Sequence, residues 1–163
     1  MVKIIAIGHF LFVTAFSGYF SKKDWQEWAD KRIMMSEKLD DWLINVSLSR
    51  DIDELSKALC DLLIDESHRI KSIPLFSDAV IGYYYLKYLD GKLSLQDLLL
   101  KSGDEADGGE GASVECEEFY AILNDVEKNK QLMEDSSFQK KIFVLFEPFG
   151  KIAELQKENL ESY

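Results

Sequence analysis

The most conspicuous side chains of this sequence are acidic. Seven carboxylates fall within 15 residues of one another, at Asp104, Glu105, Asp107, Glu110, Glu115, Glu117 and Glu118. Carboxylates bind hard metal ions such as Ca²⁺, and they also attract the Lys and Arg side chains of basic proteins. A metal ion requires a defined spacing of its ligands, whereas a basic partner does not.

The spacing argues against calcium. An EF-hand loop that starts at Asp104 has Gly109 at position 6 and Glu115 at position 12, as that loop requires. Its positions 3 and 5 are Ala106 and Gly108, whose side chains carry no oxygen. With two ligands missing, we expect no metal at this segment.

Other catalytic and cofactor-binding patterns are missing from the sequence. It contains no GxGxxG, P-loop, GxSxG or HExxH motif, and a zinc site would need nearly all of its two Cys and two His residues. Neighbouring acids should raise the pKa of Cys116 and make it a poor nucleophile. We therefore expect no enzyme, no cofactor and no catalytic residue. A pocket that joins His9 or His68 to carboxylates is the feature that would favour an enzyme instead.

Negative charge is concentrated in one part of the chain. The net charge is −11, yet residues 1–101 carry 15 acidic and 13 basic residues, and residues 128–163 carry six of each. The 26 residues between them, 102–127, carry nine acidic residues and no basic one. Such a balance argues against nucleic-acid binding, because phosphates would be repelled.

Hydrophobic periodicity predicts helices along most of the chain. Few prolines and the 3.6-residue spacing of apolar side chains favour an all-α fold of seven or eight helices in a single domain, residues 1–163. Helices are predicted to start near residue 2, at Ser21, after Asp40, at Asp51 with Glu54 in a capping box, at Pro74, at Ser94, at Ser113, and at Ser136 with Gln139 in a second capping box.

Three segments leave alternatives. Residues 102–112, rich in glycine and acid, are predicted to form a mobile loop. Pro148 should end or kink the last helix near Phe146, and a short strand at residues 142–146 is an alternative there. Residues 1–17 are predicted to form a buried helix, although their apolar run also imitates a signal sequence. That run is too short to span a membrane, and we expect no membrane contact.

The acidic segment has two interpretations. It could be a solvated tip that only keeps the protein soluble, or it could be a docking surface for a basic protein. In the second case the seven carboxylates contact the partner, and Phe119 and Tyr120 provide an apolar anchor beside them.

A resemblance to a known class favours the second interpretation. Residues 20–25, 28–30 and 41–49, with Trp25, Trp28 and Trp42, form two short tryptophan-bearing segments before an amphipathic helix. This pattern, over about a third of the chain, resembles small acidic immunity proteins of bacterial toxin–immunity systems of the contact-dependent growth inhibition type. The resemblance implies a cytoplasmic, non-enzymatic inhibitor of a basic toxin domain, often a nuclease. The alternative is a helical adaptor or regulatory module that binds its partner in an apolar groove.

Overall fold

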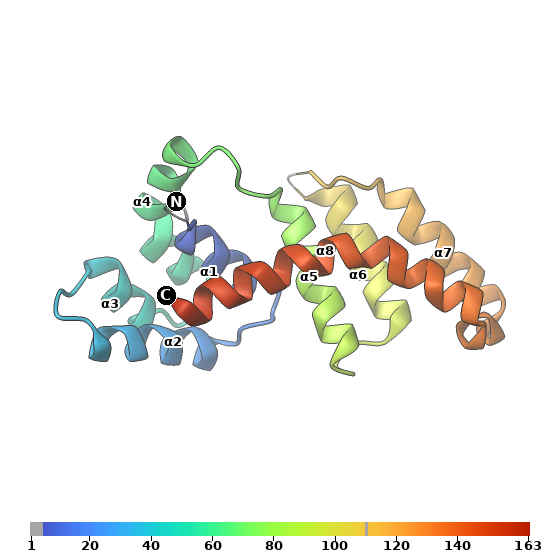
Figure 1. Cartoon of the computed structure of the whole chain (residues 1–163), viewed down its shortest axis with the longest axis horizontal. Coiled ribbons are helices and arrows are strands. Elements are labelled where there is room, and N and C mark those ends of the chain that lie inside the picture. The colour runs from blue at the N-terminus through green and yellow to red at the C-terminus, as the bar shows by residue number, and fades with distance from the viewer. Residues whose placement is uncertain (1–4, 110) are drawn as a thin grey trace. The chain divides into compact units, whose positions relative to one another are not determined.

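Helices account for all the regular secondary structure in the part of the chain that the computed structural model describes, residues 5–109 and 111–163. Figure 1 traces them in chain order. They are α1 (Ile7–Phe16), α2 (Lys22–Met35), α3 (Asp41–Leu48), α4 (Ile52–Arg69), α5 (Phe76–Leu89), α6 (Leu95–Gly108), α7 (Cys116–Lys128), the 3-10 helix η1 (Lys130–Glu134) and α8 (Ser136–Ser162). The predicted all-α fold of seven or eight helices is confirmed.

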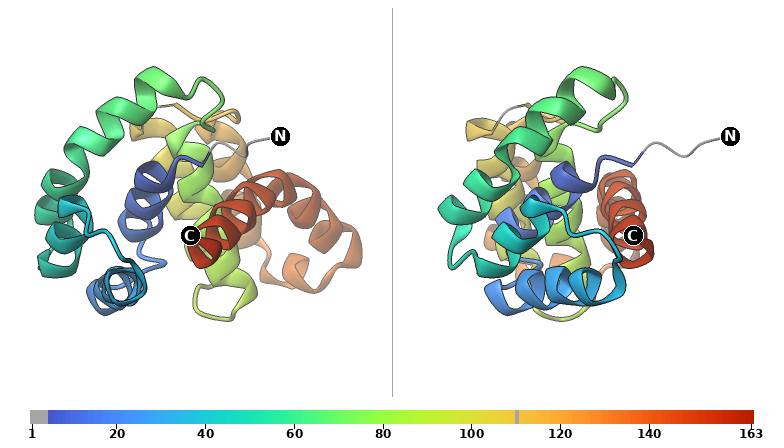
Figure 2. Two further views of the ribbon diagram at one scale, coloured as in Figure 1. Left: turned by 60° about the vertical axis from the view of Figure 1, so that its left-hand side comes forward. Right: turned by 90° about the vertical axis from the view of Figure 1, so that its left-hand side faces the viewer.

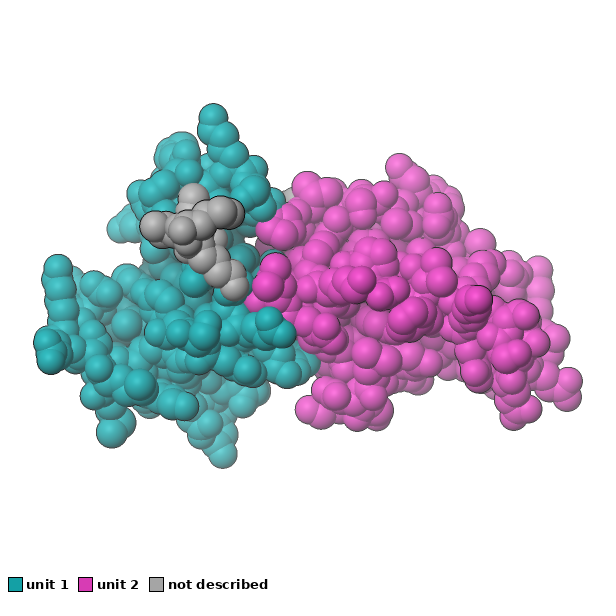
Figure 3. Space-filling model, in the orientation of Figure 1, with its two compact units in different colours: residues 1–73, 156–163 teal, residues 74–155 magenta. Residues whose placement is uncertain are grey.

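The described residues group into two compact units (Figure 3). Unit 1 is Met1–Ile73 with Gln156–Tyr163, and unit 2 is Pro74–Leu155. Each unit has its own cluster of buried apolar side chains. The prediction of one domain for the whole chain remains a prediction.

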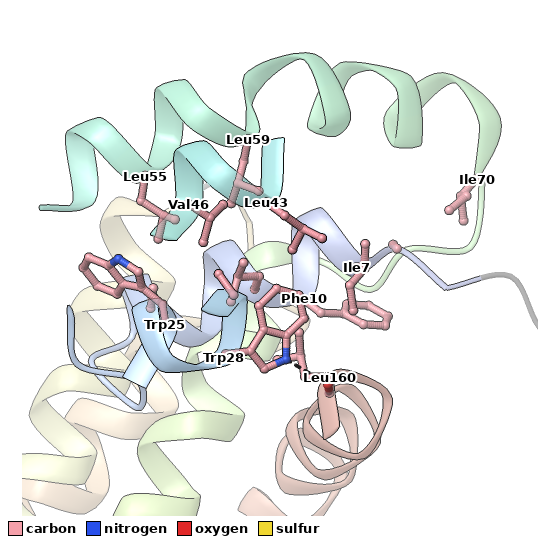
Figure 4. Close-up of a cluster of buried hydrophobic side chains, with 14 residues drawn as sticks. Ile7, Phe10, Trp25, Trp28, Leu43, Val46, Leu55, Leu59, Ile70 and Leu160 are labelled. Atoms are coloured by element: carbon pink, nitrogen blue, oxygen red, sulfur yellow. Dashed lines mark hydrogen bonds between the residues drawn. The ribbon is translucent and has the colours of Figure 1, made fainter. Parts of the chain in front are cut away.

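The core of unit 1 forms around helix α1. Its residues are apolar on nearly all sides, and Leu11 is completely buried, so the predicted buried helix is confirmed for Ile7–Phe16. Helix α2 contributes Trp25 and Trp28 to the same cluster, and helix α4 contributes Leu55 and Leu59, which recur at helical spacing. Figure 4 shows these side chains converging, and Figure 2 shows the helices that carry them from two further sides.

The last turn of α8 is held in unit 1 by side chains of α2. The indole nitrogen Nε1 of Trp28 donates to the carbonyl of Leu160 at 2.8 Å, the dashed line in Figure 4. The guanidinium of Arg32 donates to the same carbonyl at 2.6 Å and lies over the Trp28 ring. These donors satisfy a carbonyl that has no partner within its own helix.

Unit 2 depends on close packing between α5 and the first half of α8. A Cβ atom on Gly82 would lie 2.1 Å from the carbonyl oxygen of Phe149, so only glycine allows this approach. The ring of Tyr85 stacks on that of Phe146 at 5.4 Å, and Phe146 also contacts Phe119 of α7 at 5.6 Å.

Several predicted helix boundaries are corrected by the structure. Helix α8 does not end at Pro148 but continues to Ser162, and residues 142–146 are helical rather than a strand. Pro148 has no N–H to donate to the carbonyl of Val144. Both residues are exposed, so water can replace this lost hydrogen bond.

The caps of the helices also differ in part from the predictions. Asp51 caps α4 through the N–H of Glu54 at 2.8 Å, as predicted, although the Glu54 carboxylate accepts from the N–H of Arg50 instead of returning to Asp51. At the start of α8 the N–H of Phe138 donates to Asp135 rather than to Ser136. The cap is therefore one residue earlier than the Ser136–Gln139 pattern predicts.

Candidate functional site

The acidic segment is mostly helical, not a mobile loop. Residues 102–108 form the last turns of α6, which corrects the prediction of a loop over 102–112. Their small side chains continue the buried stripe of the helix, since Leu95, Leu98 and Leu99 are followed at helical spacing by Ser102 and Gly103. Asp104, Glu105 and Asp107 therefore project from a defined helix. Glu110 lies outside the described residues.

Gly103 lets α6 and α7 lie side by side (Figures 1 and 2). A Cβ atom at this position would lie 2.4 Å from the ring of Tyr120. The Tyr120 hydroxyl donates to the Asp104 carboxylate at 2.6 Å. This hydrogen bond raises the pKa of the Tyr120 hydroxyl to about 12. The tyrosine is thus a link between the two acidic helix ends.

The other carboxylates of α6 are also anchored. The Ser77 hydroxyl of α5 donates to Glu105 at 2.9 Å, and the Cys116 thiol of α7 donates to Asp107 at 3.8 Å. The pKa of the Cys116 thiol is raised, first by loss of solvation and second by the nearby carboxylates of Glu117 and Asp107. The shift has the predicted direction, although loss of solvation, not the neighbouring acids, is its first cause. The poor nucleophilicity of this thiol stays a prediction.

Electrostatics at the C-terminal end of α6 are unfavourable. Asp104, Glu105 and Asp107 lie at the negative end of the helix dipole, and the last turn carries no basic residue. The pKa of the Tyr84 hydroxyl on α5 is raised, first by burial and second by the negative charges of Glu105 and Asp104. The electric field of these two carboxylates therefore extends to the neighbouring helix. Glu117 and Glu118, by contrast, lie in the first turn of α7, where the dipole favours them. The helix dipole therefore favours the carboxylates of α7 and opposes those of α6.

Phe119 does not belong to this surface. It is completely buried and contacts Phe146 and Phe149, so its prediction as an apolar anchor for a partner is wrong. The adjacent carboxylates Glu117 and Glu118 are exposed because the helix turns successive side chains by about 100°. Tyr120 is half-buried, with its hydroxyl held by Asp104.

The predicted carboxylates divide between two faces of α7. Asp104 and Asp107 accept hydrogen bonds from Tyr120 and Cys116 of α7, and Glu117 is exposed in the first turn of α7. Glu118 lines a cavity of about 420 Å³ between α7 and α8, together with Asp125, which the predicted site did not include. Glu115 is exposed at the N-cap of α7. We refer to Asp104, Glu105, Asp107, Glu115, Glu117 and Glu118 together as the acidic surface.

A second cavity, of about 300 Å³, has an apolar lining. It lies between the end of α5 and the start of α8, where Tyr88, Leu89 and Phe143 contribute to its wall. Leu89 and Phe143 are more than half exposed. Tyr83 and Tyr85 are buried, and Tyr85 also contributes to the lining of this cavity.

His9 has a structural role in unit 1. Its ring nitrogen Nδ1 lies 2.7 Å from the carboxylate of Glu66, a residue that is 1% exposed. The same carboxylate accepts the backbone N–H groups of Gly8 and His9, in the first turn of α1. Glu66 thus acts as an N-terminal cap for a helix that has no cap of its own.

The described residues contain neither a cluster of metal ligands nor a helix that could span a membrane. Across residues 5–109 and 111–163, no three His, Cys, Asp or Glu side chains are grouped as ligands for a metal ion. Every helix in these ranges is too short or too polar to cross a membrane.

Known proteins give no further guide to this arrangement. No protein-family model matches the chain, and neither curated proteins nor solved structures show a match to it. The geometry of the acidic surface and of the two cavities is therefore the basis for assigning a function.

Proposed function

We propose that this protein is a non-enzymatic inhibitor that binds a basic protein domain through its acidic surface. The observation that carries the proposal is the position of Asp104 and Asp107, which are exposed at the C-terminal end of α6, where the helix dipole opposes them. Residues 102–127 contain no basic side chain to compensate. A cationic partner would offset the unfavourable interaction of these two carboxylates with the helix dipole.

The proposed partner is a toxin domain, in particular a nuclease. A nuclease must be cationic because its substrate is a polyanion. Carboxylates held on two helices can occupy the positions of phosphates and block that substrate. The resemblance of the tryptophan-bearing segments to bacterial immunity proteins suggests the same class and a cytoplasmic location. Asp104, Glu105, Asp107, Glu115, Glu117 and Glu118 are the proposed contacts.

Recovery of partners by two charge variants tests the proposal. One carries Asp107→Asn, Glu115→Gln and Glu117→Gln. The matched control carries Asp61→Asn, Glu134→Gln and Glu158→Gln, which removes the same charge from exposed positions elsewhere. The tagged wild-type protein and the control should retain a basic protein at low salt, and the first variant should lose it. The purified partner should then have an activity that an equal amount of this protein inhibits.

A helical adaptor is the second candidate function. The apolar cavity at Tyr88, Leu89 and Phe143 favours it, because exposed apolar side chains around a hollow are typical of protein-binding sites. Phe143→Lys would then abolish partner binding, and salt would have little effect on that binding. The two functions therefore differ both in their sensitive residue and in their salt dependence.

A further inference from the structure

The cavity between α7 and α8 combines charge with an apolar floor. Its α7 side consists of Glu118, Ala121, Ile122 and Asp125. These positions follow the spacing i, i+3, i+4 and i+7, so they form one stripe along the helix. The two acids stand at the ends of the stripe, separated by a rise of about 10.5 Å.

A second stripe lines the opposite side, on α8. Lys141, Val144 and Leu145 again follow the spacing i, i+3 and i+4. Val144 is 60% exposed, although it lies in a helix whose other face is buried in the core of unit 2. Because Pro148 has no N–H, the carbonyl of Val144 also lacks the donor that an α-helix normally provides four residues on.

We infer that this groove binds an amphipathic helix of the basic partner, with two cations seven residues apart and two apolar residues between them. The cations would pair with Glu118 and Asp125, and the apolar side chains would lie against Ala121 and Val144. A helix that carries Lys or Arg at i and i+7 matches the rise between the two acids. Helices recognised in grooves present their contacts at this spacing.

Charge complementarity selects this occupant over a neutral helix. The α7 stripe has two carboxylates, and Asp125 belongs to the same base-free segment as the acidic surface. Lys141 is the one cation of the lining among the described residues. Its removal should therefore improve binding of a cationic helix, which is the opposite of the effect expected for a merely structural residue.

The probe is a synthetic helical peptide of about 18 residues, long enough to be helical in isolation. It carries Lys at i and i+7 and Leu at i+3 and i+4, and a control peptide has the same composition with Lys at i and i+5. Titration of the full-length protein, followed by amide chemical shifts, should move the signals of Ala121, Asp125 and Val144. The control peptide should bind more weakly.

Two exposed apolar residues of α8 give a matched pair of variants. Val144→Lys should weaken peptide binding about tenfold or more, because it adds a cation and fills the groove. Leu155→Lys changes another exposed apolar residue of α8, one that lines neither of the two cavities, and it should leave the affinity unchanged. Lys141→Gln should strengthen binding roughly two- to fivefold at low salt.

The inference rests on the proposed function, but the two can fail separately. If Val144→Lys binds both the peptide and the basic partner as tightly as wild type does, the groove is not the site. The proposed function would still stand if Asp107→Asn, Glu115→Gln and Glu117→Gln weaken the partner complex. If no basic partner binds in a salt-dependent way, the proposed function fails, whatever the peptide shows. Equal binding of the two peptides would also overturn the inference.

Discussion

The Tyr120 hydroxyl on α7 donates a hydrogen bond of 2.6 Å to the Asp104 carboxylate on α6. This contact fixes the C-terminal end of one helix to the N-terminal half of the next. It is possible only because Gly103 has no side chain to push the tyrosine ring away. The acidic surface is therefore held in place before any partner arrives, which lowers the entropy cost of binding.

Substitution of Tyr120 should change the stability of the protein at high pH. The pKa of its hydroxyl is about 12 in the folded protein against about 10 when unfolded. The hydrogen bond therefore contributes full stability below pH 10, and that contribution is lost as the pH rises from about 10 to about 12. The free energy of unfolding, measured with urea, should fall less between pH 8 and pH 11 for Tyr120→Phe than for wild type. An identical pH dependence would contradict the assignment.

Removal of a charge from the end of α6 should stabilise the protein. Asp107 opposes the helix dipole, so Asp107→Asn should raise the free energy of unfolding by about 0.3–1 kcal/mol at low salt. The gain should shrink at high salt. Glu117→Gln, in the favourable first turn of α7, should lower stability instead. The same sign for both substitutions in thermal unfolding at low salt would refute the dipole argument.

Helix packing in unit 2 can be tested by two glycine substitutions with opposite expected effects. Gly82→Ala places a methyl group 2.1 Å from the carbonyl oxygen of Phe149 and should cost about 3 kcal/mol. Gly108→Ala, also in a helix, meets no atom within 4 Å and should gain about 0.5 kcal/mol. Chemical denaturation measures both. A tolerated Gly82→Ala would show that α5 and α8 are not packed as described.

The buried Glu66 carboxylate should be essential to unit 1. Glu66→Ala leaves the N–H groups of Gly8 and His9 without an acceptor and should destabilise the protein by about 3 kcal/mol. Glu66→Gln keeps one acceptor oxygen and should lose less. Urea unfolding compares the two variants. An equal loss in both would contradict this account, because Gln fills the same volume as Glu and keeps an acceptor for one of the two N–H groups.

Most of the helices could be predicted from the sequence because local patterns determine them. The spacing of Leu55 and Leu59 and the cap at Asp51 identify α4 without any knowledge of its neighbours. The continuation of α8 past Pro148 could not be predicted in this way. Whether Pro148 ends a helix depends on the exposure of the residues around it, which only the packed structure determines.

The site was predicted less well than the fold, for a similar reason. Glycine and acid predicted a loop over residues 102–112, but residues 102–108 are helical. Gly103 allows the ring of Tyr120 to pack against α6, a contact between two helices that the local sequence does not reveal. The burial of Phe119 follows from its place in the apolar stripe with Ile122, Leu123 and Val126, a signal that the sequence does contain. The groove could not be anticipated, because its two stripes lie about 20 residues apart.

The association rate with the basic partner is the most direct test of the central claim. Stopped-flow measurements at increasing salt would compare wild type with the variant that carries Asp107→Asn, Glu115→Gln and Glu117→Gln. We expect the wild-type rate to fall steeply with salt, and the variant to associate about tenfold more slowly at low salt with a flatter dependence. Equal rates and equal salt dependence for the two proteins would show that the acidic surface does not guide binding.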